Sequence, residues 1–413
     1  MESMYEAELG RRRFLRHIGL GGLAVAAPAV LAACGSSTKK AATATTVAAA
    51  GTTAAATPTT VAATATTAAT GTTVAASGGG LDALVAAAKK EGKLNLIAVP
   101  DEWANYKGII AGFKAKYGLD TNVANPEGTS AEEIEAIKTQ KGQKSQPDAI
   151  DVGPSFARDN KALLAPYKVT VWDDVPDNMK DPYGAWVGGY YGVIAIASNE
   201  KLAGGAPKSF KELADTKYKG KFALNGDPRK AASALNGVWA ASLANGGSYD
   251  DIGPGIEFFA KLKKDGILLP IDVNPAAIAS GQVAIALDWS YNWPAQKDEL
   301  AKSNITMSIN VPTDGVFGNF YSQAVVAGSP YPNAGKLWLE YLLSDEGALG
   351  YLAGGAFPAR YTKLAAAGKI PAALKATLPG EDVMSKVKFP TAAQTDAAKA
   401  AIAKDWGPKV SGS

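Results

Sequence analysis

Cysteine and histidine are nearly absent from this 413-residue chain, which contains one of each, Cys34 and His17. A single cysteine excludes disulfide bonds within the chain. From residue 35 onward neither residue occurs. This part of the chain therefore cannot carry Ser-His-Asp or Cys-His catalysis, or a zinc site built from the usual ligands. We expect no metal, no cofactor and no catalytic residue in it.

An excess of charge of one sign is also lacking. The chain has 42 Lys and Arg against 39 Asp and Glu, which gives a formal net charge of +3. This balance offers no electrostatic reason to expect a nucleic-acid partner. Residues 41–80 contain no charged, aromatic or long apolar side chain at all. Such a segment cannot bury enough apolar surface to fold, so we predict that residues 34–80 form a disordered tether.

The N-terminal segment has the features of an export signal. It contains the run Arg11, Arg12, Phe14 and Leu15, then an apolar stretch, and it ends at Leu31-Ala32-Ala33-Cys34. The first run resembles a twin-arginine signal, and the last four residues resemble a bacterial lipobox, whose cysteine is acylated. A membrane-spanning helix is the alternative, but glycines and a proline interrupt the short apolar stretch. We predict a signal peptide over residues 1–33, lipidation of Cys34, and an extracytoplasmic location at the cell membrane.

The apolar pattern from residue 81 onward is typical of an α/β fold. Residues 94–99, 122–123 and 149–152 predict strands, and apolar residues at helical spacing predict helices between them. Ser130 and Glu133 have the spacing of a capping box at the start of one of these helices. About 330 residues exceed one typical core, so we expect two lobes, each an open, mostly parallel sheet flanked by helices. Ligands of such sheets bind beyond the carboxyl ends of the strands.

A second set of segments repeats this alternation. Residues 221–224, 283–287 and 306–311 predict strands. Asp227-Pro228-Arg229 predicts the start of a helix, with aspartate at the N-cap and proline at the first helical position. The Ala- and Lys-rich last forty residues predict terminal helices.

Several short segments, in this order, resemble one family over nearly all of residues 81–409. They are Glu91–Leu94, Gly189–Ala195, Pro207–Leu213, Tyr218–Lys221, Asp227–Arg229, Trp338–Ser344 and Gly355–Arg360. The family is that of the extracellular solute-binding proteins of ABC importers, in the branch that includes ferric-ion, polyamine and phosphonate binders. No single segment is diagnostic, but their order behind a lipoprotein signal is fairly specific.

The resemblance implies a two-lobed periplasmic-binding-protein-like fold of type II with hinge strands. By this analogy the chain crosses between lobes near residues 191–199 and returns near 320–326. The implied lobes are residues 81–190 plus about 324–375, and residues 191–323, with the helices of 376–413 assigned to neither. The implied function is that of a monomeric receptor, not an enzyme, which closes over a small solute and delivers it to an ABC permease and its ATPase.

Two acid–indole pairs give the strongest prediction for a ligand site. Glu102-Trp103 and Asp288-Trp289 each stand at a predicted strand end, one in each expected lobe. Aromatic faces attract cations, and carboxylates pair with ammonium groups. The polyamine-binding relatives use such residues in comparable loops. We therefore predict a cation-accepting cleft formed by Glu102, Trp103, Tyr190, Tyr191, Asp288, Trp289 and Tyr291. The alternative is that the rings pack at a lobe edge and the acids cap turns, and neighbouring strand residues cannot all face one cleft.

Asp227 and Arg229 support a ligand of the opposite charge. A helix start presents unpaired N–H groups, and a guanidinium adds further donors. Iron- and phosphonate-binding relatives place an anion near a comparable motif, although a simple capped helix is the alternative. Ser155 and Ser233 are candidate hydrogen-bond donors for either kind of ligand. A ferric site is less favoured, because the iron-binding relatives place two adjacent tyrosines late in the second lobe, where this chain has Tyr291 alone.

A secreted glycoside hydrolase is the alternative of another class. Such an enzyme needs only two carboxylates, so the lack of histidine does not exclude it. The acidic doublets at residues 132–133, 173–174 and 250–251 lie in expected helix starts or polar turns. Caps exposed to solvent are the ordinary explanation for acids in such places. A structural envelope protein is a third class, but it would not need a two-lobed α/β body.

Overall fold

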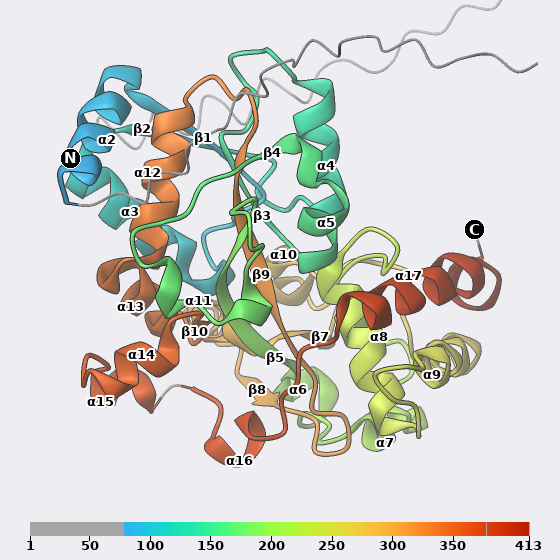
Figure 1. Cartoon of the computed structure of the whole chain (residues 1–413). Coiled ribbons are helices and arrows are strands. Elements are labelled where there is room, and N and C mark those ends of the chain that lie inside the picture. Colours follow the sequence, from blue (N-terminus) through green and yellow to red (C-terminus); the bar gives the residue numbers. More distant parts are fainter. Residues whose placement is uncertain (1–77, 377, 413) are drawn as a thin grey trace, which may run out of the picture. The chain divides into compact units, whose positions relative to one another are not determined.

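The computed structural model describes residues 78–376 and 378–412 (Figure 1). The predictions for the export signal, Cys34 and the tether lie outside these residues. The strands are β1 Lys93–Ile97, β2 Asp120–Ala124, β3 Ala149–Val152, β4 Leu164–Ala165, β5 Val187–Asn199, β6 Phe222–Leu224, β7 Ile285–Trp289, β8 Met307–Asn310, β9 Gly318–Val326 and β10 Phe357–Pro358. The longer helices are α2 Gly78–Glu91, α3 Tyr106–Tyr117, α4 Ser130–Thr139, α8 Ala232–Ala244, α9 Gly253–Lys264, α11 Trp293–Ala301, α12 Pro332–Leu343, α13 Asp345–Ala353 and α17 Ala392–Trp406. The shorter helices are α5 Pro154–Asp159, α6 Glu200–Ala203, α7 Phe210–Leu213, α10 Pro275–Ala279, α14 Tyr361–Ala366, α15 Ala372–Lys375 and α16 Glu381–Met384.

The first lobe is built on β1, β2 and β3. β1 and β2 pair in parallel, as expected for strands joined by the crossover helix α3. Four of the five residues of β1 and all of β3 are buried. Their side chains are mostly apolar, as expected for strands covered on both faces, and the two polar exceptions, Asn95 and Asp151, are hydrogen-bonded. Helices α2, α3 and α12 lie on one side of these strands and α4 and α5 on the other (Figure 1).

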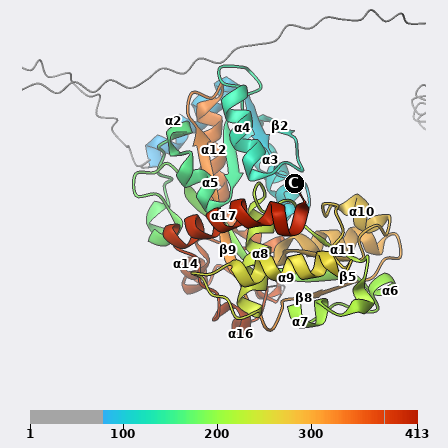
Figure 2. The ribbon, with the colours of Figure 1, turned by 90° about the vertical axis from the view of Figure 1, so that its right-hand side faces the viewer.

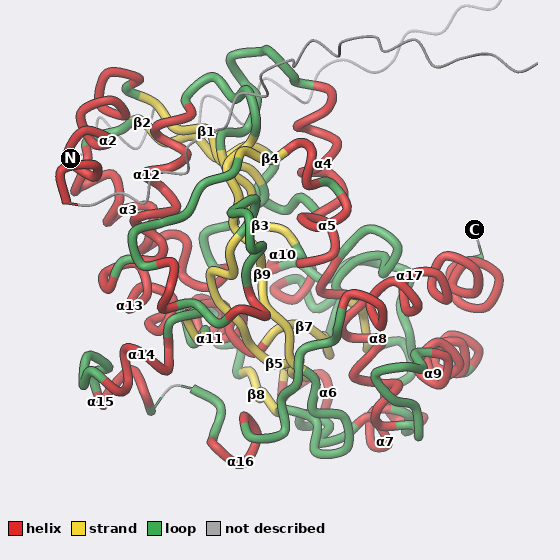
Figure 3. The backbone as a smooth tube through the Cα atoms, in the orientation of Figure 1, coloured by secondary structure: helices red, strands yellow, loops and turns green. Residues whose placement is uncertain are grey.

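Two long strands, β5 and β9, connect the parts of the molecule. β5 pairs antiparallel with β9 through Val187–Val193, and its later half pairs antiparallel with β7 and β8 through Ile194–Asn199. β9 also pairs antiparallel with β3. The strands therefore run as a central band between the helices (Figure 3), in one mixed sheet of order β3-β9-β5-β7-β6. The lobe boundaries drawn from the sequence stay a prediction.

The second lobe is built on β6, β7 and β8. β6 and β7 pair in parallel, and β7 and β8 flank the later half of β5. Helix α8 packs against α9 and β7. It is buried on all sides, with eleven buried residues that include Trp239, because it lies between the sheet and α9.

The C-terminal helix α17 lies across one face of the molecule (Figure 2). It contacts α5 of the first lobe and α9 of the second. Its Lys399 pairs with Asp159 at 2.6 Å, whereas Trp406 is buried and packs on Phe259 of α9. No helix within the described residues has the length and apolar character needed to cross a bilayer.

The structure corrects two local predictions. The capping box of α4 is formed by Thr129 and Glu132, one residue earlier than predicted. Residues 227–230 form a turn and not a helix start, because the Asp227 carboxylate accepts the Arg229 N–H at 2.9 Å and the chain folds back on itself. Helix α8 begins only at Ala232.

Candidate ligand-binding cleft

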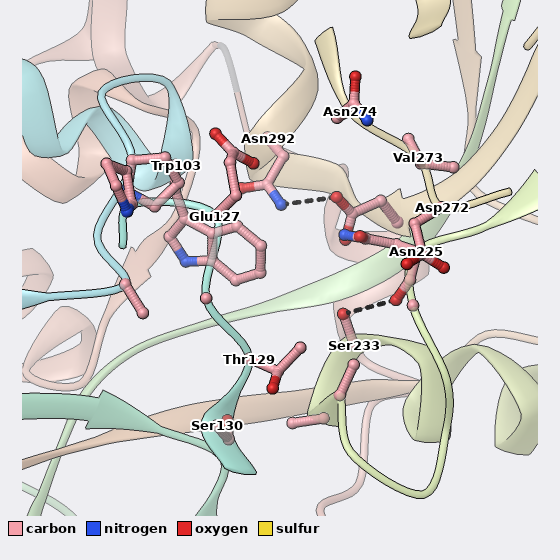
Figure 4. Close-up of a pocket in the computed structure, with 18 of the residues that line it drawn as sticks. Trp103, Glu127, Thr129, Ser130, Asn225, Ser233, Asp272, Val273, Asn274 and Asn292 are labelled. Carbon is pink, nitrogen blue, oxygen red and sulfur yellow. Dashed lines mark hydrogen bonds between the residues drawn. The ribbon is translucent and has the colours of Figure 1, made fainter. Parts of the chain in front are cut away.

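A cavity of about 310 Å³ opens where the carboxyl ends of the strands of both lobes meet. The first lobe contributes the loops after β1 and β2 and the end of β3. The second lobe contributes the loops after β6 and β7, the start of α8, and a segment before α10 (Figure 4). This is the position at which open α/β sheets bind ligands.

The ionisable side chains that line this cleft are all acidic. They are Glu102, Glu127, Glu133, Asp151, Asp272 and Asp288, and no Lys, Arg or His occurs among the described lining residues. Burial raises the pKa of Asp288 to about 6, although hydrogen bonds from Asn292 and Asn225 lower it. Desolvation also raises the pKa of Glu127, and repulsion by Glu102 and Asp288 adds to this shift. The lining of the cleft thus offers carboxylates and no cationic side chain, and these raised pKa values follow from burial and from repulsion between the acids.

An unusual backbone places Trp103 in the cleft. Ala98, which lines the cavity, and Ala104, which follows Trp103, have φ angles of 53° and 46°. Alanine seldom adopts this left-handed conformation, which costs roughly 1–2 kcal/mol per residue. The Trp103 ring is half-buried, and its Nε1 donates a hydrogen bond to the Tyr190 hydroxyl at 2.5 Å. The loop is therefore held by the residues beneath it.

Asp151 is the centre of the network under the cleft. Its Oδ2 accepts hydrogen bonds from the hydroxyls of Tyr190 and Tyr106 at 2.7 and 2.8 Å, and its Oδ1 accepts one from Gln323 at 2.6 Å. Burial raises the pKa of Asp151 to about 7 despite these three donors. Its backbone N–H donates to the buried carboxylate of Glu133 at 3.0 Å. Asp151 and Glu133 thus maintain the floor of the cleft, which leaves four acids for a ligand.

Three of the predicted aromatic residues lie beside the cleft and not in its lining. Tyr190, Trp289 and Tyr291 are at most 1% exposed. Trp289 stacks on Tyr291 with 5.8 Å between ring centroids, and Trp103 meets Tyr291 edge-on at the same separation. Gly192 of β5 makes room for this cluster, since a Cβ there would lie 2.5 Å from Cδ1 of Tyr291. These rings position Trp103, which faces the cavity itself.

The other predicted residues lie elsewhere. Tyr191 stacks on Phe357 with 5.1 Å between ring centroids. Ser155 lines a second cavity, bordered by Trp186, Trp239 and Phe389. Asp227 and Arg229 pair with each other at 2.6 Å, outside the lining of the cleft. Of the predicted ligand residues, the cleft brings together Glu102, Trp103, Ser233 and Asp288.

Most residues of the lining had no role in the sequence-based prediction of the ligand site. Among them are Glu127, Asn225, Asp272, Asn292, Gln296 and Tyr321. Within the described residues no group of three or more His, Cys, Asp or Glu is arranged to hold a metal ion.

A family model for bacterial extracellular solute-binding proteins matches residues 150–387, which is more than half of the chain. The chain belongs to this family. It is therefore an extracellular solute-binding protein of the ABC transporter class, with a small-molecule solute and a permease as the partners that the family implies. The family is one of transport proteins and not of enzymes.

Three solved structures have a similar fold. Iron-bound HitA from Pseudomonas aeruginosa aligns with a TM-score of 0.56 at 22% identity, over 76% of this chain and 99% of HitA. AfuA from Actinobacillus pleuropneumoniae with bound fructose-6-phosphate gives 0.57 at 16% identity, over 77% and 98%. A protein described as a spermidine/putrescine ABC transporter from Listeria monocytogenes gives 0.56 at 12%, over 76% and 98%. At these identities the likeness concerns the fold, and it confirms the predicted two-lobed type II architecture.

Proposed function

We propose that this protein captures a small organic cation, with a polyamine as the best candidate, and delivers it to an ABC permease. The proposal rests on the charge of the cleft: every charged side chain among the described lining residues is a carboxylate. Trp103 and Tyr321 add aromatic faces to this acidic surface. Carboxylates and aromatic faces together are the groups that recognise ammonium ions.

An anionic solute is disfavoured by the same residues. A phosphonate or sugar phosphate would need a cation in the cleft, and the predicted one, Arg229, forms an ion pair with Asp227 outside the lining. A ferric site of the kind predicted as an alternative would need paired tyrosines, whereas Tyr190 and Tyr191 have other contacts. A glycoside hydrolase is disfavoured because, of the acidic doublets at residues 132–133, 173–174 and 250–251, only Glu133 lines the cleft, and its carboxylate accepts the Asp151 N–H in the cleft floor.

We further propose that the receptor is monomeric and anchored by lipid at Cys34, on a tether that follows an export signal with Arg11 and Arg12. The sequence of residues 1–80 supports this proposal. Metabolic labelling with a radioactive fatty acid tests it. We expect label in the intact protein and none in the Cys34→Ala variant, whereas label that persists in the variant would contradict lipidation at this residue.

Calorimetric titration of the purified protein tests the choice of solute. We expect reversible one-to-one binding of at least one of spermidine, putrescine, choline and thiamine. We expect no binding of fructose-6-phosphate, 2-aminoethylphosphonate or ferric citrate. 1,4-Butanediol is a matched control, because it has the carbon chain of putrescine without its charges. Binding of an anion in the absence of any cation binding would overturn the proposal, as would turnover of a bound glycan.

The affinity for the cation is expected to depend on pH. Since the pKa of Asp288 is raised to about 6, its carboxylate is ionised at pH 7 and mostly protonated at pH 5. A cation that binds the ionised form should therefore lose about tenfold in affinity between pH 7 and pH 5. Calorimetry at a series of pH values, with the same ligand and constant ionic strength, measures this slope. A flat profile down to pH 5 would show that Asp288 does not contact the ligand.

A further inference from the structure

The wall of the cleft that follows β7 presents two amide oxygens without a hydrogen-bond partner. Asn292 is 1% exposed and Gln296 is 8% exposed, and both line the cavity. The Oδ1 of Asn292 and the Oε1 of Gln296 have no partner among the described residues. Buried polar atoms normally have one, and an acceptor that lacks it costs free energy. These two oxygens could therefore each accept a hydrogen bond from a bound ligand.

The orientation of the Asn292 amide follows from its neighbour. Its Nδ2 donates a hydrogen bond to the Asp288 carboxylate at 2.9 Å, which fixes the opposite atom as an oxygen (Figure 4). Gln296 lies four residues further on, on the same side of the helical segment formed by residues 290–301. Asp288, Asn292 and Gln296 thus form a row of acceptors along one wall, which combines one negative charge with two neutral carbonyl oxygens.

Such a row distinguishes between two kinds of organic cation. A protonated amine or a guanidinium carries N–H groups that can satisfy the carboxylate and both amide oxygens at once. A quaternary ammonium has the same charge but no N–H group, so it would leave both oxygens buried and unpaired. The aromatic faces of Trp103 and Tyr321 alone would accept either kind, since cation–π attraction does not need an N–H donor.

We propose that the wall formed by Asp288, Asn292 and Gln296 is a subsite for a cationic head with N–H donors, and that the two amides reject quaternary ammonium. The inference rests on the proposed function, because it assumes a cation in the cleft. It restricts the solute to amines and guanidines, and it identifies Asn292 and Gln296 as residues that determine specificity.

Pairs of ligands that differ only in N-methylation test this inference. Ethanolamine and choline are one pair, and putrescine and its hexamethylated bis-quaternary analogue are another. By calorimetry we expect the methylated member of a pair to bind about 30-fold or more weakly, since two acceptors lose their donors. Equal or tighter binding of the methylated member would overturn the inference but leave the proposed function intact. Failure of every cation tested would overturn both.

The Gln296→Met variant tests whether quaternary ammonium is rejected for lack of hydrogen bonds or because its methyl groups are too large. Methionine nearly keeps the volume of the side chain and removes the acceptor, so the preference for the amine should shrink by about tenfold. Gln143→Met is the matched control, because Gln143 is exposed and outside the lining of the cleft, and it should leave the preference unchanged. A thermal unfolding curve verifies that each variant is folded. A preference that is unchanged in Gln296→Met would show that methyl bulk, not the amide row, causes the rejection.

Discussion

Replacing Asp288 by asparagine is expected to weaken the binding of an organic cation by about 30-fold or more. Asp288 is 4% exposed and lies in the cleft, where it accepts a hydrogen bond from Asn292. Removing one member of a buried charge pair costs about 2 kcal/mol or more. Asparagine keeps the shape of the side chain, and its one amide oxygen can still accept either the Trp289 N–H or the Asn292 N–H, both of which Asp288 accepts. A thermal unfolding curve therefore separates any loss of stability from the loss of ligand affinity.

Asp272→Asn is the matched control for this change. Asp272 also lines the cleft and carries the same charge, but its side chain is exposed to solvent. Its removal should reduce affinity by less than about fivefold, because water screens exposed charges. Calorimetry with putrescine or spermidine measures both variants. An Asp288→Asn protein that binds as tightly as the parent would show that Asp288 does not pair with the cation.

Replacing Asp151 by alanine is expected to destabilise the protein by about 2 kcal/mol, because an orphaned buried donor costs about 1–3 kcal/mol. The change removes the acceptor of the Tyr190 hydroxyl, whereas the Tyr106 hydroxyl and the Gln323 amide keep longer contacts of 3.3 Å to Tyr351 and Tyr106. Chemical denaturation measures the difference. Asp151→Asn is the control, because its amide oxygen can still accept the two hydroxyls. A small effect of alanine would show that water replaces the lost carboxylate.

The same residue predicts how stability depends on pH. The pKa of Asp151 is raised to about 7 in the folded protein, whereas an unfolded aspartate titrates near its ordinary value of about 4. Between these values the folded state binds more protons than the unfolded state, so the contribution of Asp151 to stability falls as pH rises from about 4 to 7. In Asp151→Asn this contribution is absent. We expect the variant to lose less stability than the parent over that interval, and parallel profiles would contradict a raised pKa.

Elements with a dense apolar pattern could be predicted closely from the sequence. Helix α3, Tyr106–Tyr117, lies between the predicted strands 94–99 and 122–123, where apolar residues at helical spacing predict a helix, and Gly118 after it adopts the left-handed conformation of a C-cap. β3 has the predicted bounds Ala149–Val152. Both segments are buried, so local pattern and tertiary packing favour the same structure.

Predictions that depended on one polar side chain were less reliable. The sequence Thr129-Ser130-Ala131-Glu132-Glu133 fits a capping box in two registers, and the sequence pattern alone cannot distinguish them. In the structure Ser130 and Glu133 are buried and bind backbone N–H groups of the segment around β3, at Gly153 and Asp151. Packing against another strand therefore decides the register. The helix start predicted at Asp227 was also wrong. There the Asp227 side chain accepts the Arg229 N–H and stabilises a turn.

The cleft itself could be predicted only in part. The apolar pattern of the sequence predicted where several strands end. Glu102 and Asp288, the acids at two of these predicted ends, do line the cavity. Trp289, next to Asp288, points the other way into the core, as the alternation of side chains along a strand requires. Glu127, Asn292 and Gln296 carry no local signal, because they meet the cleft only when distant loops come together. Their roles depend on the tertiary structure.

The acids of the cleft belong to both lobes, and this has a consequence for the unloaded receptor. Glu127 stands on the first lobe and Asp288 on the second. Burial is the main cause of the raised pKa of Glu127, and repulsion by Glu102 and then by Asp288 adds to it. We infer that an empty receptor resists shutting, because closure brings like charges together where little water screens them. In the proposed function, a cation bound between these acids would replace that repulsion by attraction to both lobes. The closed form would then be the one that carries the cation, and loss of the cation to the permease would favour reopening.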